Sequence, residues 1–342
     1  MRVLVTGANG HIGAHVVRAL LDDGHEVKAF MREGCDQRGL AGLVFEPVYG
    51  DVMDAASLEK AVVGCDAVIH LAAVYKTIAN TAEEIVAPAI QGAENLYRAA
   101  HKAGVQRIVY TSSVASVGFS YDPTALRTGN DWNDDPHNPY YIAKTRSEQA
   151  AQRLARETGI HTVVICPAIV LGPLDYRITP SNQLVMDWLN GTGQTYRGGL
   201  SLVDVRDVAR AHVAALQAGE NCRRYIVGGD NIRVRDIGEL LASLTGFRPM
   251  HLPFNRTLTL LTARIVETVC RTLKITPPFT YDLVYEVADR YAWYDCRETY
   301  ETFGFTPKGA EEVLKGSVEW LISQGKIRNR RAQSIQPKRS AP

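Results

Sequence analysis

The first half of the chain alternates short apolar runs with longer stretches in which apolar residues recur every three or four positions. The short runs predict buried β-strands and the longer stretches predict amphipathic helices. Strands that are buried on both faces and separated by helices are typical of a parallel sheet covered by helices. We therefore predict an α/β fold with a doubly wound parallel sheet. The predicted strands are 2–6, 26–31, 42–50, 66–73, 106–113 and 161–172, and the predicted helices are 11–24, 54–65, 83–104 and 139–159.

The alternation loosens after about residue 172, where a second, smaller part of the chain begins. Segment 201–229 has the pattern of a strand, a helix and a strand, which we expect to complete the sheet. The last segment is basic and has no apolar period, so it predicts a flexible tail. The predicted organisation is a first domain at 1–172 with its sheet completed by 201–229, a smaller, mostly helical cap at 173–200 and 230–325, and a tail at 326–342.

One later segment, 256–273, is the most apolar of the second half, and it carries Arg264, Glu267 and Arg271. These charges exclude a membrane span and predict an amphipathic helix instead. We expect its apolar face to pack against the protein core. The alternative is a face for a membrane surface or a lipophilic substrate.

Composition narrows the class of protein. The 342 residues are 46% hydrophobic and 22% charged, which suits a soluble globular protein. Its 38 Lys and Arg face 37 Asp and Glu, so the formal net charge of +1 gives no indication of a nucleic-acid partner. The six cysteines form no CxxC pair and lack a His-rich neighbourhood, which favours reduced thiols and no metal site. No leader peptide or membrane span is evident, and we expect a cytoplasmic protein.

Three glycines separate the first predicted strand from the first predicted helix in "TGANGHIG". Gly7 permits a tight turn, Gly10 lets the backbone approach a pyrophosphate, and Gly13 allows close packing of the helix on the strand. The amide groups from about His11 onward then present the positive end of the helix dipole to the phosphates. This loop predicts a Rossmann-type dinucleotide site.

The end of the second predicted strand indicates which dinucleotide binds. Folds that prefer NAD usually have Asp or Glu there, to accept from the ribose 2′-hydroxyl. This chain has Met31 followed by Arg32. A guanidinium can bind a 2′-phosphate, and we expect no acidic neighbour to repel it, so NADP(H) is favoured and NAD(H) stays possible. An ordinary surface arginine is the alternative. Asp51 either accepts from the adenine amino group or caps the next helix.

The segment "NPYYIAK" places Tyr140 four residues before Lys144, on one face of the predicted helix. A nearby ammonium lowers the pKa of a phenol, which can then exchange a proton with a carbonyl or alcohol oxygen. Tyr141, three residues before Lys144, lies on the same broad side. Ser112 and Ser113 end the fifth predicted strand, where this fold binds its ligands, and either hydroxyl could polarise the same oxygen.

Together, "TGANGHIG", "HLAA", "YTSS", Tyr140-x-x-x-Lys144 and "SLVDVRDVA" resemble the extended short-chain dehydrogenase/reductase superfamily, which includes the NAD-dependent epimerase/dehydratase family. The resemblance runs from residue 1 to about 325 and is nearest to the dihydroflavonol 4-reductase-like branch. It implies that Tyr140 is the catalytic acid/base, Lys144 its partner, Ser113 the catalytic serine and Tyr141 a packing or wall residue. It implies cofactor contacts from Gly7, Asn9, Gly10, His11, Ile12, Gly13, Arg32, Asp51, Val52, Leu71, Ala72, Ala73, Thr111, Tyr140, Lys144, Pro167, Ile169 and Val170.

The chain also departs from its relatives. Ala89 stands where many carry asparagine, and Leu200 and Ser201 replace the arginine and first aspartate typical of sugar-nucleotide epimerases. We therefore favour an NADPH-dependent reductase of a ketone or aldehyde, which would also run as an alcohol dehydrogenase. An epimerase or dehydratase with retained NAD(P) is the second hypothesis, because Arg177, Arg197 and Arg206 could serve anions. A non-catalytic NADP-sensing regulator is the third, although the Tyr/Lys pair counts against it.

The substrate is expected between the strand ends and the cap. Its predicted walls are Tyr75 with 76–82, Phe119 to Tyr121, the loop 131–138 and part of 173–200. The resemblance further implies a homodimer formed by the helices at 84–103 and 140–157.

Overall fold

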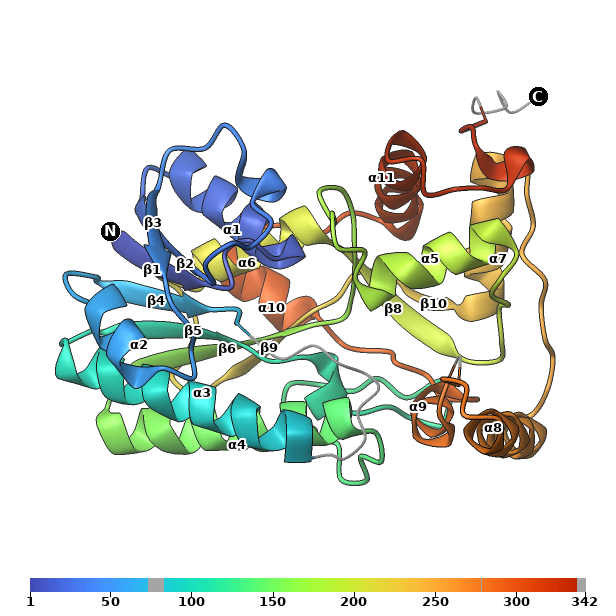
Figure 1. Ribbon diagram of the computed structural model, residues 1–342, viewed down its shortest axis with the longest axis horizontal. Coiled ribbons are helices and arrows are strands. Elements are labelled where there is room, and N and C mark those ends of the chain that lie inside the picture. The colour runs from blue at the N-terminus through green and yellow to red at the C-terminus, as the bar shows by residue number, and fades with distance from the viewer. Residues whose placement is uncertain (73–82, 278, 337–342) are drawn as a thin grey trace.

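Seven parallel strands form a large sheet in the order β3-β2-β1-β4-β5-β6-β9 (Figure 1). The computed structural model describes residues 1–72, 83–277 and 279–336. Apolar side chains bury most of these strands on both faces, as the sequence predicts, whereas the edge strand β3 is mostly exposed. The strands are β1 (Arg2–Thr6), β2 (Glu26–Met31), β3 (Glu46–Tyr49), β4 (Ala67–His70), β5 (Arg107–Thr111), β6 (His161–Pro167) and β9 (Arg224–Val227). The predicted doubly wound α/β sheet is confirmed.

Helices cover both faces of this sheet. On one face α1 (His11–Asp22) packs against α6 (Val205–Ala214), and on the other α3 (Glu83–Lys102) packs against α2 (Ala55–Ala61) and α4 (Pro139–Thr158) (Figure 1). A further helix, α10 (Arg297–Phe303), contacts β9. We call the large sheet with these helices the large lobe.

The remaining elements form a small lobe around a three-stranded sheet of order β10-β8-β7. Helix α11 packs against α5, α7 and this sheet, while α8 and α9 contact each other farther out (Figure 1). The elements are β7 (Ile169–Leu171), β8 (Gly199–Asp204), β10 (Asn231–Arg233), α5 (Pro180–Asn190), α7 (Val234–Thr245), α8 (Arg256–Thr272), α9 (Tyr281–Val287) and α11 (Ala310–Ser323). Short 3-10 turns lie at Arg38–Leu40, Val114–Ser116 and Arg330–Ala332. The sequence-based division into a binding domain, a cap and a tail stays a prediction.

Two strand predictions are corrected. Segment 161–172 is not one strand, because it divides at Ala168 into β6 of the large sheet and β7 of the small one. Within 201–229 only β9 joins the large sheet, where it pairs with β6. That edge of β6 is therefore occupied, and β8 pairs instead with β7 and β10. Sequence patterns show that a segment is a strand but not which sheet receives it.

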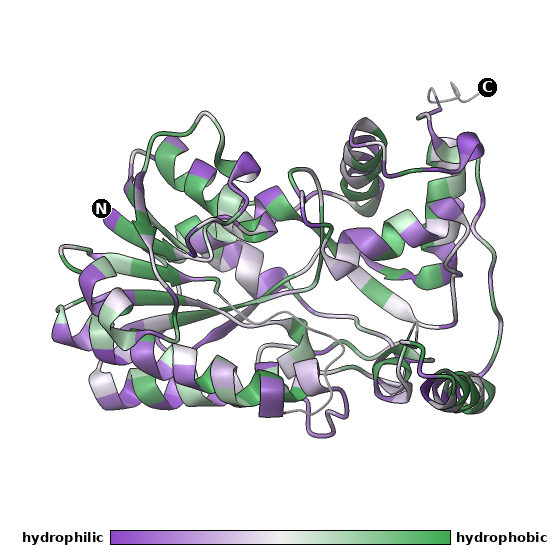
Figure 2. Ribbon diagram, in the orientation of Figure 1, coloured by the Kyte–Doolittle hydropathy of each residue, from purple (hydrophilic) through white to green (hydrophobic). Residues whose placement is uncertain are grey.

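The expectation that the helix at 256–273 faces the core is wrong. Ala263 is the only buried residue of α8. Leu258, Leu261, Ile265 and Val269 are 44%, 55%, 55% and 50% exposed, and Leu273, just after the helix, is 62% exposed. Figure 2 shows hydrophobic colour on α8 although this helix lies at the periphery of the molecule. We call these five residues the α8 stripe. Among the described helices, none is long and apolar enough to cross a membrane.

Candidate active site

A cavity of about 1400 Å³ lies between the carboxyl ends of the large-sheet strands and the small lobe. The strand order reverses between β1 and β4, and in such sheets the crevice at this point receives the ligand. Every described residue that the sequence assigned to catalysis or cofactor binding lines this cavity, whereas Ala73, Tyr75 and 76–82 lie outside the described residues. The lining includes Gly7, Asn9, Gly10, His11, Ile12, Gly13, Arg32, Asp51, Val52, Leu71, Ala72, Thr111, Ser113, Tyr140, Lys144, Pro167, Ile169 and Val170.

Backbone atoms lie so close to the glycine loop that they leave little room for side chains at two of its glycines. Gly7 has a φ of +70°, and a Cβ on it would lie 3.0 Å from the Ala72 amide nitrogen. A Cβ on Gly13 would lie 2.2 Å from the Gly7 carbonyl oxygen. The obstacle at Gly13 is thus the loop itself, rather than the strand that we expected. No side chain larger than hydrogen fits either position without a backbone shift.

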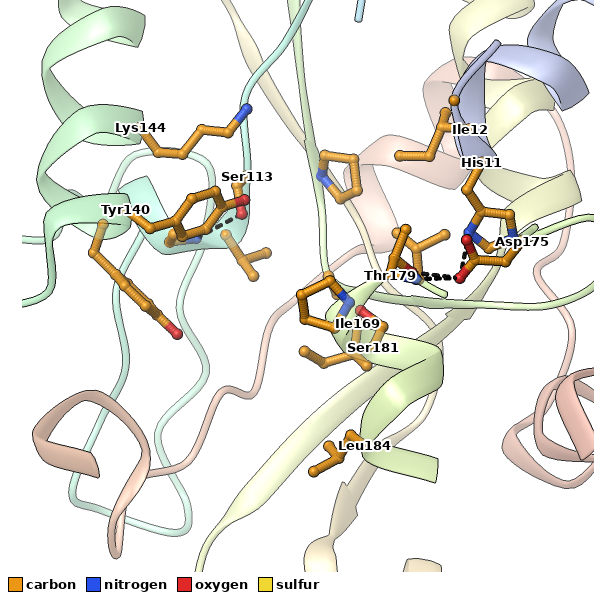
Figure 3. Close-up of a pocket in the computed structure, with 18 of the residues that line it drawn as sticks. His11, Ile12, Ser113, Tyr140, Lys144, Ile169, Asp175, Thr179, Ser181 and Leu184 are labelled. Atoms are coloured by element: carbon orange, nitrogen blue, oxygen red, sulfur yellow. Dashed lines mark hydrogen bonds and ion pairs between the residues drawn. The ribbon is translucent and has the colours of Figure 1, made fainter. Parts of the chain in front are cut away.

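Two histidines tie the glycine loop to the small lobe. The Nε2 atoms of His11 and His15 lie 3.0 and 3.1 Å from the Pro173 carbonyl oxygen, to which both donate. Burial lowers the pKa of both imidazoles, that of His15 to about 4, so both are neutral at pH 7. Asp175, on the far wall of the cavity in Figure 3, accepts from the amide and hydroxyl of Thr179.

At the other end of the cavity, Arg32 follows β2 with an exposed side chain that makes no hydrogen bond or ion pair to a described residue. Asp36 also lines the cavity. Arg38 chelates the Asp36 carboxylate and holds the pKa of that carboxyl at about 2. The carboxylate is therefore already paired with a cation, which leaves Arg32 available to an anion.

Asp51 does not cap the next helix. Its carboxylate accepts from the Met53 amide at 2.9 Å, whereas Asp54 caps α2 by accepting from Ala56. Of its two predicted roles, the helix cap is thus excluded. The contact with the adenine amino group stays a prediction, and Asp51 does line the cavity.

The two serines after β5 differ in their surroundings. Ser112 is buried, and its hydroxyl donates to Glu148 and contacts Ser116 at 3.1 Å. Ser113 is half-buried, and its oxygen accepts from the Ala115 amide at 3.1 Å, which leaves its hydroxyl hydrogen to point elsewhere. Only Ser113 can therefore offer a proton to a ligand without giving up a buried carboxylate contact.

A buried ion pair contacts the turn after β5 that carries Ser112, Ser113 and Ser116. Glu148, one helical turn after Lys144 on α4, lies 2.5 Å from Nε of Arg224 on β9 and accepts from the Ser116 hydroxyl at 2.5 Å. Both charged side chains are almost completely buried, and the Arg224 guanidinium stacks 3.9 Å from the Trp132 ring centre. The pair joins α4, the turn after β5 and the edge strand β9, and so fixes the wall that carries Ser113 and Lys144.

A second buried carboxylate holds the residues just before α4, the helix that carries Tyr140 in its first turn. Asn138 caps the helix by accepting from the Tyr140 amide at 2.9 Å. Glu286 of α9, fully buried, accepts from the amides of His137 and Asn138 at 2.6 and 3.0 Å and pairs with Arg290 at 3.1 Å. Figure 3 shows Tyr140, Lys144 and Ser113 on one wall of the cavity, with the Tyr140 ring directed toward Ser113. The small lobe thus holds the start of the helix that carries Tyr140.

Lys144 lies between this tyrosine and the sheet. Its Nζ donates to the Thr111 carbonyl at 3.4 Å, and burial lowers the pKa of its ammonium to about 8. Burial, and after it the charge of Lys144, lowers the pKa of His70 to about 3. The Thr6 hydroxyl accepts from the Leu71 and Ala72 amides, so it must donate to Nδ1 of a neutral His70. Of these two side chains, only Lys144 therefore carries a positive charge at pH 7.

The small-lobe end of the cavity is mostly apolar. The two charged side chains at this end, Glu286 and Arg290, form an ion pair with each other, and Arg290 also donates to the Tyr121 hydroxyl. The aromatic and aliphatic lining includes Phe119, Tyr141, Leu184, Trp188, Leu200, Leu252, Phe279, Leu283, Val284 and Val287. Phe119 and part of 173–200 line the cavity, whereas Tyr121 and the loop 131–138 do not, contrary to prediction. Within the described part of the chain, no cluster of His, Cys, Asp and Glu could hold a metal ion.

Comparison with known proteins agrees with this geometry. The model of the NAD dependent epimerase/dehydratase family matches residues 3–228, which is more than half of the chain. The chain belongs to this family. The predicted membership of the extended short-chain dehydrogenase/reductases is thereby confirmed.

Among the relatives of this family member are two proteins named as reductases and one solved structure. A putative dihydroflavonol 4-reductase from Synechocystis sp. is 30% identical over 95% of this chain and 95% of its own length. Cinnamoyl-CoA reductase 1 from Arabidopsis thaliana is 35% identical over 71% of this chain and 74% of its own. The crystal structure of gox2253 superposes with a TM-score of 0.83 at 28% identity, covering 95% of this chain and 99% of that one. These matches confirm the prediction of an NAD(P)-dependent oxidoreductase.

A nicotinamide dinucleotide, the cofactor of this family, fits the residues present. The backbone cradle at Gly7 and Gly13 has no room for side chains, and the N-terminus of α1 presents amide groups beside it. Arg32 would hold the adenosine end, while Lys144 and Tyr140 lie at the other end of the same cavity. The volume exceeds the few hundred to about 1,000 Å³ of ordinary small-molecule sites, so it has room for a second ligand.

Sequence reasoning missed three residues that organise this family member's site. Glu148 had a signal, because it stands four residues after Lys144 and shares its helix face. Glu286 had none, since the amides from which it accepts lie more than one hundred positions away, and the 3.9 Å contact of the Asp175 carboxylate with His11 had none for the same reason. Such carboxylates become recognisable only when the fold brings their contacts together.

Proposed function

We propose that the protein is an NADPH-dependent reductase of an apolar ketone or aldehyde, able to run in reverse as an alcohol dehydrogenase. The observation that carries the proposal is the common wall formed by Ser113, Tyr140 and Lys144 inside the cavity that also holds the glycine loop. A proton donor, a cation and a hydroxyl at one place are what carbonyl reduction requires.

When bound, the nicotinamide supplies or accepts the hydride. Tyr140 gives its phenolic proton to the carbonyl oxygen, so that the carbonyl compound becomes an alcohol, and takes a proton back from water. The Ser113 hydroxyl donates a hydrogen bond to the same oxygen, because its own oxygen is already satisfied by Ala115. The Lys144 ammonium stabilises the phenolate formed on Tyr140 and would hold the nicotinamide ribose.

The apolar chamber supports a carbonyl compound rather than a sugar nucleotide. Leu200 lines the cavity at a position where epimerases typically have arginine. Arg206 is engaged by Asp204 at 2.7 Å, and Arg197 is exposed and pairs with Asp289 at 3.3 Å. Of the three arginines that could serve a diphosphate, only Arg177 lines the cavity. This distribution offers a diphosphate little compensation for its lost hydration.

The preference for NADPH rests on Arg32. Its guanidinium lies at the end of β2 on the cavity wall, without a carboxylate of its own, and the nearby Asp36 is occupied by Arg38. A 2′-phosphate would gain a charge-assisted contact there that a 2′-hydroxyl cannot make.

The test follows NADPH and NADH absorbance against a panel of aromatic and aliphatic ketones and aldehydes. We expect stoichiometric conversion of NADPH and a carbonyl compound to NADP⁺ and alcohol, with cofactor released on dilution. Tightly retained cofactor, conversion of a sugar nucleotide and no net NADPH consumption would identify an epimerase instead. Cofactor binding without turnover of any panel member or sugar nucleotide would support a sensing role and contradict the proposal.

A further inference from the structure

The α8 stripe is an apolar surface that the described protein does not cover. Leu258, Leu261, Ile265 and Val269 follow one another at helical spacing, so they lie along one face of α8, and Leu273 extends that face beyond its end. Phe254 before the helix and Ile275 after it are exposed as well. Scattered exposed apolar residues need no explanation, but five along one side of a helix indicate a contact surface.

Exposed cations lie beside this stripe, while the acidic residue of α8 is mostly buried. Arg264, Arg271 and Lys274 are exposed on or just after α8. Glu267 is the only acidic residue of the helix and is 15% exposed, since its carboxylate accepts from the Tyr281 amide at 2.7 Å and pairs with Arg271. Arg264 lies over the Tyr281 ring at 5.4 Å and pairs with no described carboxylate. The outer side of α8 is therefore apolar along its middle and positive at its border.

The inner side of the same helix belongs to the cavity. Thr259 and Ala263 line it, together with Leu283 and Val284 of the adjoining helix α9. Arg256 fixes α8 to α9 by donating to the carbonyls of Tyr285 and Ala288 at 3.1 and 2.7 Å. Whatever binds the stripe thus lies one helix diameter from the substrate chamber.

We propose that α8 is an interfacial helix that docks this protein on an anionic lipid bilayer. A helix with an apolar face and cationic borders is the form that lies in the plane of a membrane surface, with its apolar side chains among the acyl chains. Arg264 and Lys274 would meet anionic head groups, since long cationic side chains extend toward them from the edge of such a face, while Arg271 stays paired with Glu267.

A second copy of this chain is the competing occupant of the stripe, and charge disfavours it. Two copies joined through a two-fold axis bring the same surface together, so the cations of one would face those of the other. An anionic bilayer complements both the apolar and the positive parts of the surface. Docking would also place the chamber beside the lipid, where an apolar carbonyl compound dissolves; this last point rests on the proposed function.

The test is flotation of the full chain with vesicles of phosphatidylcholine containing phosphatidylglycerol, compared with phosphatidylcholine alone. We expect binding to the anionic vesicles that weakens in high salt. The double variant Leu261→Gln/Ile265→Gln should bind at least tenfold more weakly, and Arg264→Gln/Lys274→Gln should lose about fivefold for each cation. Val44→Gln/Val63→Gln, which removes two exposed apolar residues of the large lobe, should bind like the wild type.

Three results would overturn the inference. The wild type does not float with anionic vesicles, or it floats equally well after Leu261→Gln/Ile265→Gln. The third is a dimer in sedimentation velocity that this double variant converts to monomer while neither protein binds vesicles, which would assign the stripe to a second copy. Because flotation needs no turnover, failure of docking and failure of the proposed reductase activity are read separately.

Discussion

The two lobes shape their halves of the cavity by different means. On the large-lobe side the close contacts are between backbone atoms, as at Gly7 and Gly13, where an added methyl group would meet carbonyl and amide atoms. On the small-lobe side the surface consists of side chains from α5, α8 and α9, such as Leu184 and Val284. On the large-lobe side, one added methyl group at these glycines would meet backbone atoms. On the small-lobe side, side-chain substitutions can change the shape of the cavity without moving the backbone.

The same contrast applies to charge. Arg32, in the large lobe, is exposed on the cavity wall and has no described carboxylate, while Glu286 and Arg290, in the small lobe, neutralise each other in a buried pair. The large lobe therefore keeps a cation for an anionic ligand. The small lobe uses its buried charges to hold its own framework and leaves an apolar chamber. The difference is consistent with the proposed function, in which a dinucleotide binds on one side and an apolar substrate on the other.

Tyr140 lies where the halves meet, and its substitution should have the largest effect. Tyr140→Phe removes the proton donor and should lower kcat for carbonyl reduction by about 10²- to 10⁴-fold. Tyr141→Phe is the matched control, since Tyr141 stacks edge-on with Phe119 at 5.6 Å and is assigned to the wall; it should change kcat by less than threefold. Steady-state kinetics with NADPH measure both. Equal losses in the two variants would remove the distinction between the two tyrosines.

Glu286 tests how far the small lobe controls the large one. Glu286→Gln leaves the Arg290 guanidinium buried without its counter-charge and should lower the free energy of unfolding by roughly 3 kcal/mol. It should also lower kcat while changing the KM for NADPH little, because the amides of His137 and Asn138, just before Tyr140, lose their charged acceptor.

The matched control is the double variant Glu286→Gln/Arg290→Met, which removes both charges. Urea denaturation should show most of the lost stability restored, while the kcat defect should remain. If the double variant is no more stable than Glu286→Gln, the pair is not the source of the stability loss.

Arg32 tests the large-lobe side alone. Arg32→Gln should raise the KM for NADPH by about 10- to 100-fold, the range of a lost charge-assisted contact, and leave the KM for NADH within threefold. The measurement is initial rates with each cofactor at a fixed carbonyl substrate. An equal change for both cofactors would place Arg32 outside the 2′-phosphate site.

Sequence reasoning worked best where local backbone rules decide the structure. The glycine loop, the strand that precedes it and the helix of Tyr140 and Lys144 are set by short-range patterns, and all were placed where the structure has them. It failed for β8 and α8, because the partner of a strand edge and the covered side of an amphipathic helix depend on distant segments. The amphipathic period of segment 256–273 identified α8 as a helix, but no local pattern shows that Leu261 faces outward.

Lys144 gives the last and smallest effect, and it links the chemistry to stability with opposite signs. In the proposed reaction its ammonium supports proton transfer from Tyr140. Because its pKa is about 8, carbonyl reduction should fall by up to tenfold between pH 7 and 9 as this charge is lost. The folded pKa lies below the ordinary value of 10.5, so the unfolded chain binds more protons between these values. The contribution of Lys144 to stability should therefore rise with pH over this window.

The experiment compares wild type with Lys144→Met in both properties. Buried thiols and phenols, such as Cys166 and Tyr110 with pKa values raised to about 12, oppose the stability gain at high pH, and the difference between the two proteins cancels them. We expect the stability of the wild type relative to Lys144→Met to increase from pH 8 to 9 while wild-type activity falls. If both quantities fall together, the alkaline loss of activity is unfolding, and the cation at the meeting point of the lobes has no separate role.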